Sequence, residues 1–308
     1  MKERYDIVIP IARKDIGFLY KVTFYIRKNL KDADKIFIIT NKKNFNHEFF
    51  KSNIDEKILC LDENELINDL SFKRVQDLLV KHQWYNSPGW YLQQFLKLGF
   101  SLTNYANKYY LTWDSDTLPL SKIDFFDEGH PLFTKKNEFH PAYFETIENL
   151  LGLKKQNKFS YIAEHMIFDV DIVKEMLTKI EETDLEGNNW FEKCISACNF
   201  NSKFPGPHFS EFETYGTYCA VYHPDVYHYR TLNTFRGAGF IRGRRINDEI
   251  LKKMSLDLDT ASFELYDKPP FPYNFPYYQL IVKDKWSKFS KIPFNRQLKI
   301  ILKNLFVK

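Results

Sequence analysis

Long hydrophobic runs are missing from this 308-residue chain. No window approaches 18 uncharged apolar residues, so we expect no transmembrane helix. The stretch Met1 to Asp6 is charged and leads into an apolar segment, so we expect no signal peptide. Internal repeats and low-complexity linkers are also absent. With 44% hydrophobic and 17% aromatic residues, the chain can bury a large core, and disorder is expected only at the carboxyl-terminal tail.

Cysteine is scarce, with only Cys60, Cys194, Cys198 and Cys219 present. Cys194 and Cys198 are four residues apart and would share one face of a helix, but no further ligands follow at a zinc-site spacing. Reduced thiols in a cytosolic protein are therefore expected.

The net charge of +4 is unevenly distributed. Residues 283–308 hold eight Lys or Arg and one Asp, a net +7, which leaves −3 for the rest of the chain. This mildly acidic body argues against general nucleic-acid binding. In the tail, apolar residues recur at helical spacing between the basic ones. We favour a C-terminal amphipathic helix on an anionic membrane over a helix docked on the protein's own core.

Apolar patterning predicts strands that alternate with helices in the first 120 residues. The predicted strands are 5–12, 35–40, 57–61 and 109–113. The predicted helices are 15–30, 64–81 and 89–105. Such alternation is typical of an α/β fold, an open and mostly parallel sheet flanked by helices.

The pattern becomes irregular after Pro119, with loops rich in Pro, His and aromatic residues. A strand at 160–168 and helices at 170–182 and 210–222 are still predicted. We expect a single domain over 1–282, with a nucleotide-binding half to about residue 120 and an irregular acceptor-binding half over 121–282. The tail 283–308 follows it.

The most informative motif directly follows the predicted strand 109–113. Asp114 and Asp116 are two residues apart, so both can face one point beyond the end of the strand. Two carboxylates suit a hard cation such as Mg²⁺ or Mn²⁺, which leaves positions open for phosphate oxygens. Ligands of open α/β sheets bind beyond the carboxyl ends of the strands. The motif predicts a metal–phosphate site, and the alternative is a polar turn with an Asp cap.

The helix 89–105 comes immediately before that strand. Trp90, Gln93, Gln94 and Lys97 have the spacing of one helix face. An indole, two amides and an ammonium suit a base, ribose or sugar near the metal. The alternative is a solvated polar face, with Trp90 packed against a neighbouring loop.

Arginine is rare, with 10 residues against 34 lysines, yet five arginines fall within residues 230–245. The planar guanidinium grips phosphate oxygens in a bidentate way that lysine cannot. Arg230 and Arg236 are therefore candidates for a loop over a diphosphate, and the alternative is a flexible basic surface loop. His228 is a candidate further metal ligand, although a lone histidine is more often structural.

Two carboxylates begin the helix 210–222. In a capping box, Ser210 caps this helix and Glu213 reaches back to it, which leaves Glu211 for chemistry. Either Glu211 or Glu213 is a candidate general base. Glu164 and His165, on the strand 160–168, are candidates for contact with an acceptor hydroxyl, with a core histidine as the alternative.

Taken in order, several segments resemble a known family. They are Asp-Ile-Val-Ile-Pro from residue 6, Gly-Trp-Tyr-Leu-Gln-Gln-Phe-Leu-Lys-Leu from 89, Trp-Asp-Ser-Asp-Thr from 113, Glu-His-Met-Ile-Phe from 164 and Ser-Glu-Phe-Glu-Thr-Tyr-Gly from 210. The set resembles the GT-A type nucleotide-sugar glycosyltransferases, which have a Rossmann-like sheet. More narrowly, it is similar to bacterial enzymes of surface-polysaccharide and lipopolysaccharide assembly. The resemblance covers about residues 5–245.

The resemblance implies roles for the same residues. Asp116 would bind Mn²⁺ or Mg²⁺, and Asp114 would contact the ribose or the metal. Gln93, Gln94 and Lys97 would line the donor pocket, and Arg236 would neutralise phosphate. Glu211 or Glu213 would bind or deprotonate the acceptor hydroxyl. The residues leave open whether the reaction is retaining or inverting.

The sequence therefore predicts a metal-dependent glycosyltransferase that moves a sugar from a nucleotide-diphosphate donor to a growing bacterial surface glycan. Its expected place is the cytoplasmic face of the inner membrane, held peripherally by the tail. One alternative is a sugar nucleotidyltransferase, but a glycine-rich loop does not follow the first strand. The other alternative is a non-catalytic carbohydrate-binding protein, which would not need the Asp pair and the arginine loop together.

Overall fold

The computed structural model describes residues 3–270. The chain divides into two compact units, Met1–Leu232 and Asn233–Lys308. This boundary lies inside the predicted acceptor half. The predicted tail 283–308 lies outside the described residues. Within residues 3–270, no helix combines the length and the hydrophobicity that crossing a membrane requires.

The first unit is built on a five-stranded sheet with the order β3-β2-β1-β4-β8. Its strands are β1 Tyr5–Pro10, β2 Ala33–Thr40, β3 Ile58–Asp62, β4 Tyr109–Trp113 and β8 His165–Asp169. The first four are parallel to one another, and β8 runs antiparallel to β4. All residues of β1, β4 and β8 are buried, as expected for strands covered on both faces. The predicted α/β fold with a mostly parallel sheet is confirmed.

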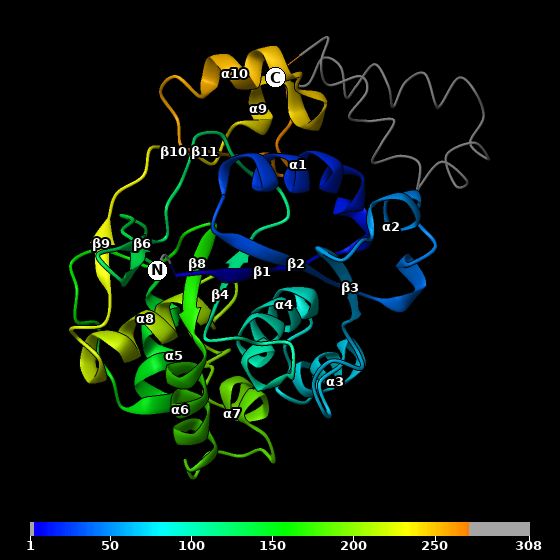
Figure 1. The fold of residues 1–308 in the computed structure, drawn as a ribbon. Coiled ribbons are helices and arrows are strands. Elements are labelled where there is room, and N and C mark those ends of the chain that lie inside the picture. The colour runs from blue at the N-terminus through cyan, green and yellow to red at the C-terminus, as the bar shows by residue number, and fades with distance from the viewer. Residues whose placement is uncertain (1–2, 271–308) are drawn as a thin grey trace. The chain divides into compact units, whose positions relative to one another are not determined.

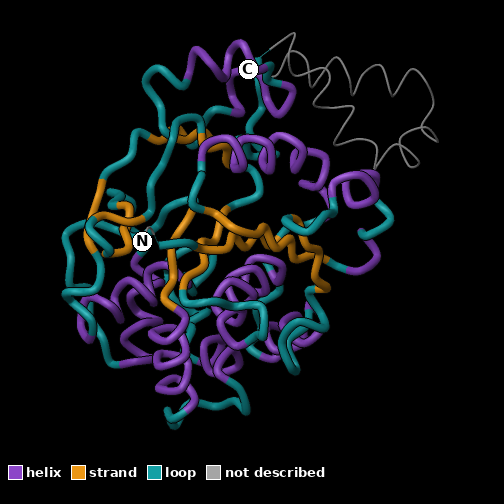
Figure 2. The backbone as a smooth tube through the Cα atoms, in the orientation of Figure 1, coloured by secondary structure: helices purple, strands orange, loops and turns teal. Residues whose placement is uncertain are grey.

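Helices cover this sheet on opposite sides (Figures 1 and 2). After the 3₁₀ turn η1 Arg13–Phe18, α1 Leu19–Asn29 leads from β1 to β2. Helices α3 Phe72–Lys81 and α4 Pro88–Gly99 lead from β3 back to β4 and lie across the sheet from α1. Right-handed crossovers on both sides of β1 place the helices in this way, since the strand order reverses there.

The segment 64–81, predicted as helix, is helical only from Phe72. Ser71 caps α3 by accepting a hydrogen bond from the backbone N–H of Arg74 at 3.2 Å. The helix predicted at 89–105 is α4, extended by the 3₁₀ turn η3 Phe100–Leu102. Pro88 occupies the first turn of α4, where its missing N–H costs no helical hydrogen bond.

The rest of the first unit adds short strands and further helices, most of them near β8, whereas α2 lies beside β3 at the other edge of the sheet (Figure 1). It contains the short strands β5 Thr117–Pro119, β6 Phe126–Asp127, β7 His130–Thr134 and β9 His228–Arg230, of which the last three form a small sheet in the order β6-β7-β9. Its helices are α2 Glu48–Asn53, α5 Pro141–Leu151, α6 Val170–Glu181, α7 Trp190–Ser196 and α8 Glu211–Tyr222. The predicted helices 170–182 and 210–222 are confirmed as α6 and α8. The predicted strand 160–168 is shorter and begins only at His165.

Aromatic side chains fill the core between the sheet and α8. Tyr110 on β4 stacks on Phe168 of β8, with ring centroids 5.2 Å apart. On α8, a Cβ atom at Gly216 would lie 2.4 Å from the Tyr161 ring. A glycine is therefore required where α8 packs against this tyrosine. The four cysteines carry free thiols, and only Cys60 is not buried.

The second unit has little regular structure in its described part. Strands β10 Thr234–Phe235 and β11 Thr260–Ser262 pair in parallel. Between them lie α9 Gly239–Arg242, the 3₁₀ turn η4 Gly243–Arg245 and α10 Asp248–Met254. Asn247 caps α10 by accepting a hydrogen bond from the backbone N–H of Ile250 at 3.0 Å.

Candidate active site at the carboxyl end of strand β4

Asp114 and Asp116 lie at the point where the strand order of the sheet reverses. Strand β1 pairs in parallel with both β2 and β4. Helix α1 connects β1 to β2 on one face of the sheet, whereas α3 and α4 lead into β4 on the other face. The carboxyl ends of two such strands form the crevice in which open α/β sheets bind ligands. The pair directly follows β4, as predicted.

The turn that carries the two aspartates is held by hydrogen bonds. The Asp114 N–H donates to the carbonyl of Glu164 at 2.9 Å, which continues the pairing of β4 with β8. The carbonyl of Asp114 accepts from the Thr117 N–H at 3.1 Å, and the Trp113 indole donates to the Thr117 carbonyl at 2.8 Å. The segment after β4 therefore forms a hydrogen-bonded turn. The turn holds the backbone of Asp114 and Asp116, whose carboxylates are half-buried.

The two aspartates fit a divalent cation by the chemistry of their donor atoms. Carboxylate oxygens are the ligands that Mg²⁺ and Mn²⁺ prefer, and Mg²⁺ commonly binds through one or two of them plus phosphate oxygens and water. In the described part of the chain, no group of three or more His, Cys, Asp or Glu side chains is placed to hold a metal.

A buried ammonium lies behind Asp114. Lys97 on α4 is 2.9 Å from Oδ1 of Asp114 and 2.8 Å from Oε1 of Glu211, the first residue of α8. The Lys97 and Glu211 side chains are 3% and 2% exposed, whereas Asp114 is 26% exposed. The side-chain amide of Gln94 also faces the Glu211 carboxylate, with its NH₂ group as the hydrogen-bond donor. These residues come from separate parts of the sequence, since Lys97 and Glu211 are 114 positions apart, and the fold joins them in one cluster.

Burial and charge oppose each other in this cluster. Burial alone would lower the pKa of Lys97, but the carboxylates of Asp114 and Glu211 outweigh it and raise that pKa. Burial also raises the pKa of Glu211, although the Lys97 ammonium pulls it down. Lys97 therefore stays charged in the interior because it is paired, which is the condition under which buried charges persist.

Glu213 faces a different part of the interior. Ser210 caps α8 as predicted, since its Oγ accepts from the Glu213 N–H at 3.3 Å. The Glu213 carboxylate, however, does not complete a capping box, because it accepts hydrogen bonds from the Ser160 hydroxyl and from the Tyr161 N–H. Burial raises the pKa of Glu213. Both candidate bases are thus shielded from solvent and bound to different partners.

His165 lies in the core of the first unit. Its ring stacks on Trp113 across β4 and β8, with centroids 5.0 Å apart, and Nε2 is 3.0 Å from the hydroxyl of Thr134. Burial lowers the pKa of His165 well below its usual 6.5, assisted by the charges of Arg230 and Lys136. The histidine is therefore neutral, which matches the core alternative. Glu164, beside it, is buried and pairs with Lys136 at 3.2 Å.

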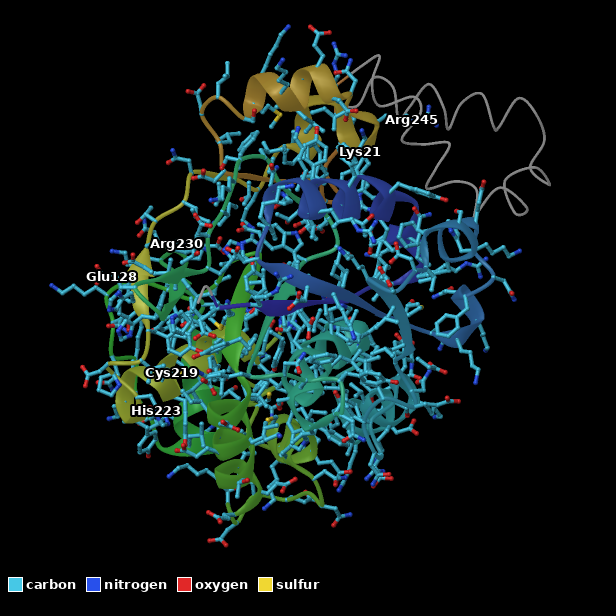
Figure 3. All side chains as sticks on the ribbon, viewed as in Figure 1. Lys21, Glu128, Cys219, His223, Arg230 and Arg245 are labelled. Atoms are coloured by element: carbon cyan, nitrogen blue, oxygen red, sulfur yellow. The ribbon has the colours of Figure 1, made fainter. Side chains whose placement is uncertain are left out.

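Arg230 reaches the same region from β9. Its Nε donates to the Thr134 hydroxyl at 3.2 Å, and its guanidinium lies over the Phe125 ring. Figure 3 shows Arg230 and Glu128 on one flank of the first unit. His228, two residues before Arg230, stacks on His130 at 4.2 Å and approaches Asp127 at 3.6 Å. The fold thus brings Arg230 next to His165, and it places His228 in the β6-β7-β9 sheet.

The polar face predicted on α4 divides into two parts. Gln94 and Lys97 are buried, whereas Gln93 is half-buried and Trp90 is exposed. The indole of Trp90 donates to the carbonyl of Phe209 at 3.4 Å, which matches the alternative of packing against a neighbouring loop. Arg236 belongs to the second unit, directly after β10, so it is not among the residues that the first unit brings together.

Sequence reasoning missed two cations at the same edge of the sheet. Arg13 and Lys14 are exposed and follow β1, whose carboxyl end lies beside that of β4. The sequence shows that both residues directly follow the first predicted strand. Their place near the Asp pair follows only from the strand order, which puts β1 next to β4.

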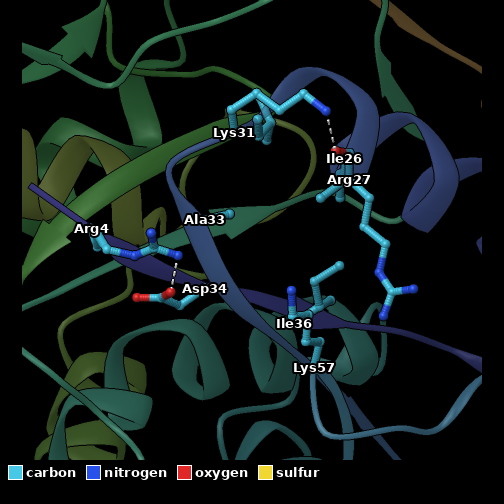
Figure 4. A pocket seen from close by; sticks show the side chains of 9 residues that line it. Arg4, Ile26, Arg27, Lys31, Ala33, Asp34, Ile36 and Lys57 are labelled. Atoms are coloured by element: carbon cyan, nitrogen blue, oxygen red, sulfur yellow. Dashed lines mark hydrogen bonds and ion pairs between the residues drawn. The ribbon is translucent and has the colours of Figure 1, made fainter. Parts of the chain in front are cut away.

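A cavity of about 300 Å³ lies at the opposite edge of the sheet (Figure 4). It is lined by residues at the amino ends of the strands and by the end of α1, including Arg4, Arg27, Lys31 and Lys57. The two guanidiniums are already paired, Arg4 with Asp34 and Arg27 with Asp55. Because ligands of open sheets bind at the carboxyl edge, this cavity is not part of the candidate active site.

Fold and site together define the first unit as an open α/β domain with a carboxylate site at its switch point. The profile of DUF6492, described as a family of unknown function, matches residues 6–234, and the chain belongs to that family. No curated protein sequence matches the chain.

Several solved structures are similar to the chain at low identity. Galactosyltransferase LgtC, in complex with donor and acceptor sugar analogs, has 11% identity and a TM-score of 0.41 over 94% of this chain and 98% of that one. Mouse xyloside xylosyltransferase 1 has 8% identity and a TM-score of 0.41 over 87% and 99%. Core-mannan synthase A from Aspergillus fumigatus, in a Mn/GDP form, has 11% identity and a TM-score of 0.48 over 74% and 73%. Glycosyltransferases are the class that the sequence resemblance named.

Proposed function

We propose that this protein is a metal-dependent glycosyltransferase, which moves a sugar from a nucleotide-diphosphate donor to a growing bacterial surface glycan. The observation that carries the proposal is the position of Asp114 and Asp116. They follow β4 at the switch point of an open α/β sheet, with the exposed Arg13 and Lys14 after the neighbouring strand β1. Carboxylates for a cation beside cations for phosphate suit the diphosphate of such a donor.

In the reaction, the bond between the anomeric carbon and the donor diphosphate breaks. A new bond forms between that carbon and an acceptor hydroxyl oxygen, whose proton passes to the departing diphosphate or to solvent. Asp116 and Asp114 would hold Mn²⁺ or Mg²⁺, and the cation would stabilise the negative charge of the departing diphosphate as a Lewis acid. Arg13 and Lys14 would add positive charge along the same edge of the sheet.

The remaining predicted contacts belong to this proposal as well. Trp90 and Gln93 would contact the base or sugar of the donor, since they are the accessible part of the α4 face. Glu164 and His165 are buried, so they would position the residues that bind the acceptor and would not contact the acceptor themselves. The basic segment 283–308 would hold the enzyme at the anionic inner face of the cytoplasmic membrane, and this segment lies outside the described residues.

Thermal stability in the presence of nucleotides tests the proposal. A ligand that binds only the native state raises stability with the logarithm of its concentration over its Kd. We expect one family of nucleoside diphosphates or nucleotide sugars to stabilise the wild-type protein, and to do so only with Mn²⁺ or Mg²⁺. Asp116→Ala should abolish that shift. Asp77→Ala is the matched control, because Asp77 is an exposed residue of α3 that pairs with Lys73 four residues away.

Transfer to a glycan acceptor then separates the enzyme from a carbohydrate-binding protein. Turnover in the wild type, lost in Asp116→Ala with the melting temperature of the unliganded protein retained, supports the glycosyltransferase. Glycan binding that is equal in both proteins, without turnover in either, contradicts it and supports a binding protein.

A further inference from the structure

We propose that Glu211 is a positioning residue that acts on the candidate active site through Lys97, and that it is not the catalytic base. The inference rests on the proposed function, in which Asp114 takes part in holding a cation. It assigns to Lys97 and Glu211 the task of fixing the orientation and the charge of the Asp114 carboxylate.

The contacts form a continuous path from the core to the crevice. The Glu211 carboxylate is 2.8 Å from the Lys97 ammonium, which is 2.9 Å from Oδ1 of Asp114. Three separate elements supply these residues, namely α8, α4 and the turn after β4. The path therefore holds the turn against both helices that lie behind it.

Further contacts fix the ammonium in its place. Lys97 Nζ lies over the Phe212 ring, 4.4 Å from its centroid. The hydroxyl of Tyr110 donates to the Lys97 carbonyl at 2.8 Å, which ties α4 to β4 at the same level. A lysine with a buried stem and a paired, stacked ammonium has little freedom to leave Asp114.

Burial argues against a base at Glu211. A general base must come within hydrogen-bond distance of the acceptor hydroxyl. The Glu211 side chain is 2% exposed, and its carboxylate is occupied by Lys97 and Gln94. Asp114 is the member of the cluster that reaches solvent, so only Asp114 is placed to meet a ligand.

The cluster also sets how strongly Asp114 can attract a cation. The single positive charge of Lys97 is shared between two carboxylates. If Glu211 loses its charge, Lys97 acts on Asp114 alone, and Asp114 becomes a weaker ligand. Partners behind a ligand typically change metal affinity by about ten- to hundredfold when they are replaced.

A double-variant cycle on cation binding tests this. Free Mn²⁺ would be measured by electron paramagnetic resonance during titration of the full chain with the stabilising nucleotide present. We expect Glu211→Gln to weaken Mn²⁺ binding about tenfold or more. In a Lys97→Met background, Glu211→Gln should change the Mn²⁺ affinity by less than about twofold, since the path through Lys97 is already cut.

Glu192→Gln is the matched control for loss of a buried carboxylate. Glu192 is 5% exposed and pairs with Arg74, away from the crevice. It should leave Mn²⁺ affinity unchanged, whatever it does to stability.

The outcomes separate this inference from the function on which it rests. If wild-type protein with nucleotide binds no Mn²⁺, the metal-dependent function fails, and the inference fails with it. If wild type binds Mn²⁺ and Glu211→Gln binds it equally well but no longer transfers sugar, Glu211 is a base and the inference alone is wrong. An equal loss of affinity from Glu211→Gln in the Lys97→Met background also overturns it.

A measurement on the wild-type protein tests the inference even if the variants do not fold. The ¹⁵N resonance of the Lys97 ammonium, protected by burial, should shift when Mg²⁺ and nucleotide bind, because its partner Asp114 then becomes a ligand. An unchanged resonance in protein that binds Mg²⁺ would contradict the inference.

Discussion

Trp113 and His165 stack face to face across β4 and β8, with ring planes 11° apart and centroids separated by 5.0 Å. The two residues stand at the ends of their strands, one position before Asp114 and one after Glu164. The turn that presents the Asp pair therefore rests on a neutral aromatic layer. The stacked Trp113 and His165 rings support the turn, and neither ring carries a charge.

The stack predicts a specific pH dependence of stability. Burial lowers the pKa of His165 in the folded state, whereas the unfolded chain titrates near 6.5. Below pH 6.5 the unfolded state binds the extra proton, so stability falls as the pH decreases towards the folded-state pKa. His165→Phe should reduce that slope by up to about 1.4 kcal/mol per pH unit, as measured by urea unfolding at several pH values. Equal slopes in the two proteins would show that His165 is not held neutral.

Lys97→Met should strongly destabilise the first unit. The variant leaves the Glu211 carboxylate buried without its cation, and breaking a buried pair in this way costs about 3–5 kcal/mol. The change in the free energy of unfolding would be measured by urea denaturation at neutral pH. Arg27→Met is the comparison, because Arg27 and its partner Asp55 are 45% and 46% exposed and such pairs contribute about 1 kcal/mol or less. Similar losses in both variants would contradict the role of burial.

Gly216→Ala should destabilise α8 against the core. The added Cβ would meet three atoms of the Tyr161 ring at 2.4–2.7 Å, and overpacking of this kind costs about 1–3 kcal/mol. Gly17→Ala is the control, since no atom lies within 4 Å of its would-be Cβ. Thermal unfolding should show a lower melting temperature for the first variant only. Recovery in Gly216→Ala/Tyr161→Leu would confirm the ring as the obstacle.

Arg13→Ala and Lys14→Ala should each weaken nucleotide-diphosphate binding without loss of stability. Both side chains are exposed, so their removal leaves no buried group unpaired. A phosphate contact should make the loss of affinity largest at low salt, where charges are least screened. Isothermal titration at two salt concentrations would measure it, with the exposed Lys174→Ala of α6 as control. Affinities that match the control would remove these two residues from the site.

Regular elements of the first unit could be predicted because their apolar patterns are local. The buried runs of β1, β2 and β4 and the helical spacing of apolar residues in α1 appear directly in the sequence. The pattern was less informative where a cap set the boundary, as at Ser71 before α3. The short strands β5, β6 and β9 were missed because two or three residues carry no periodicity, and β7 was missed as well.

The candidate site could be predicted only in part, because local spacing reveals the Asp pair but not contacts between distant residues. The spacing of Asp114 and Asp116 after a buried strand is local, so the sequence pointed to the pair without help from tertiary contacts. The cluster behind it depends on contacts between distant residues, since Lys97 and Glu211 are 114 positions apart. The capping box at Ser210 suggested that Glu211 was available for chemistry, yet the fold buries both glutamates.

The sequence by itself determined the strands and helices of the α/β sheet and the place of the Asp pair at a strand end. Periodicity and local spacing are properties of the chain that survive without tertiary contacts. The tertiary structure alone decided the strand order, the antiparallel β8 and the pairing of Lys97 with both carboxylates. These features depend on which segments meet in space, and burial then decides which charged groups must be paired and which can face a ligand.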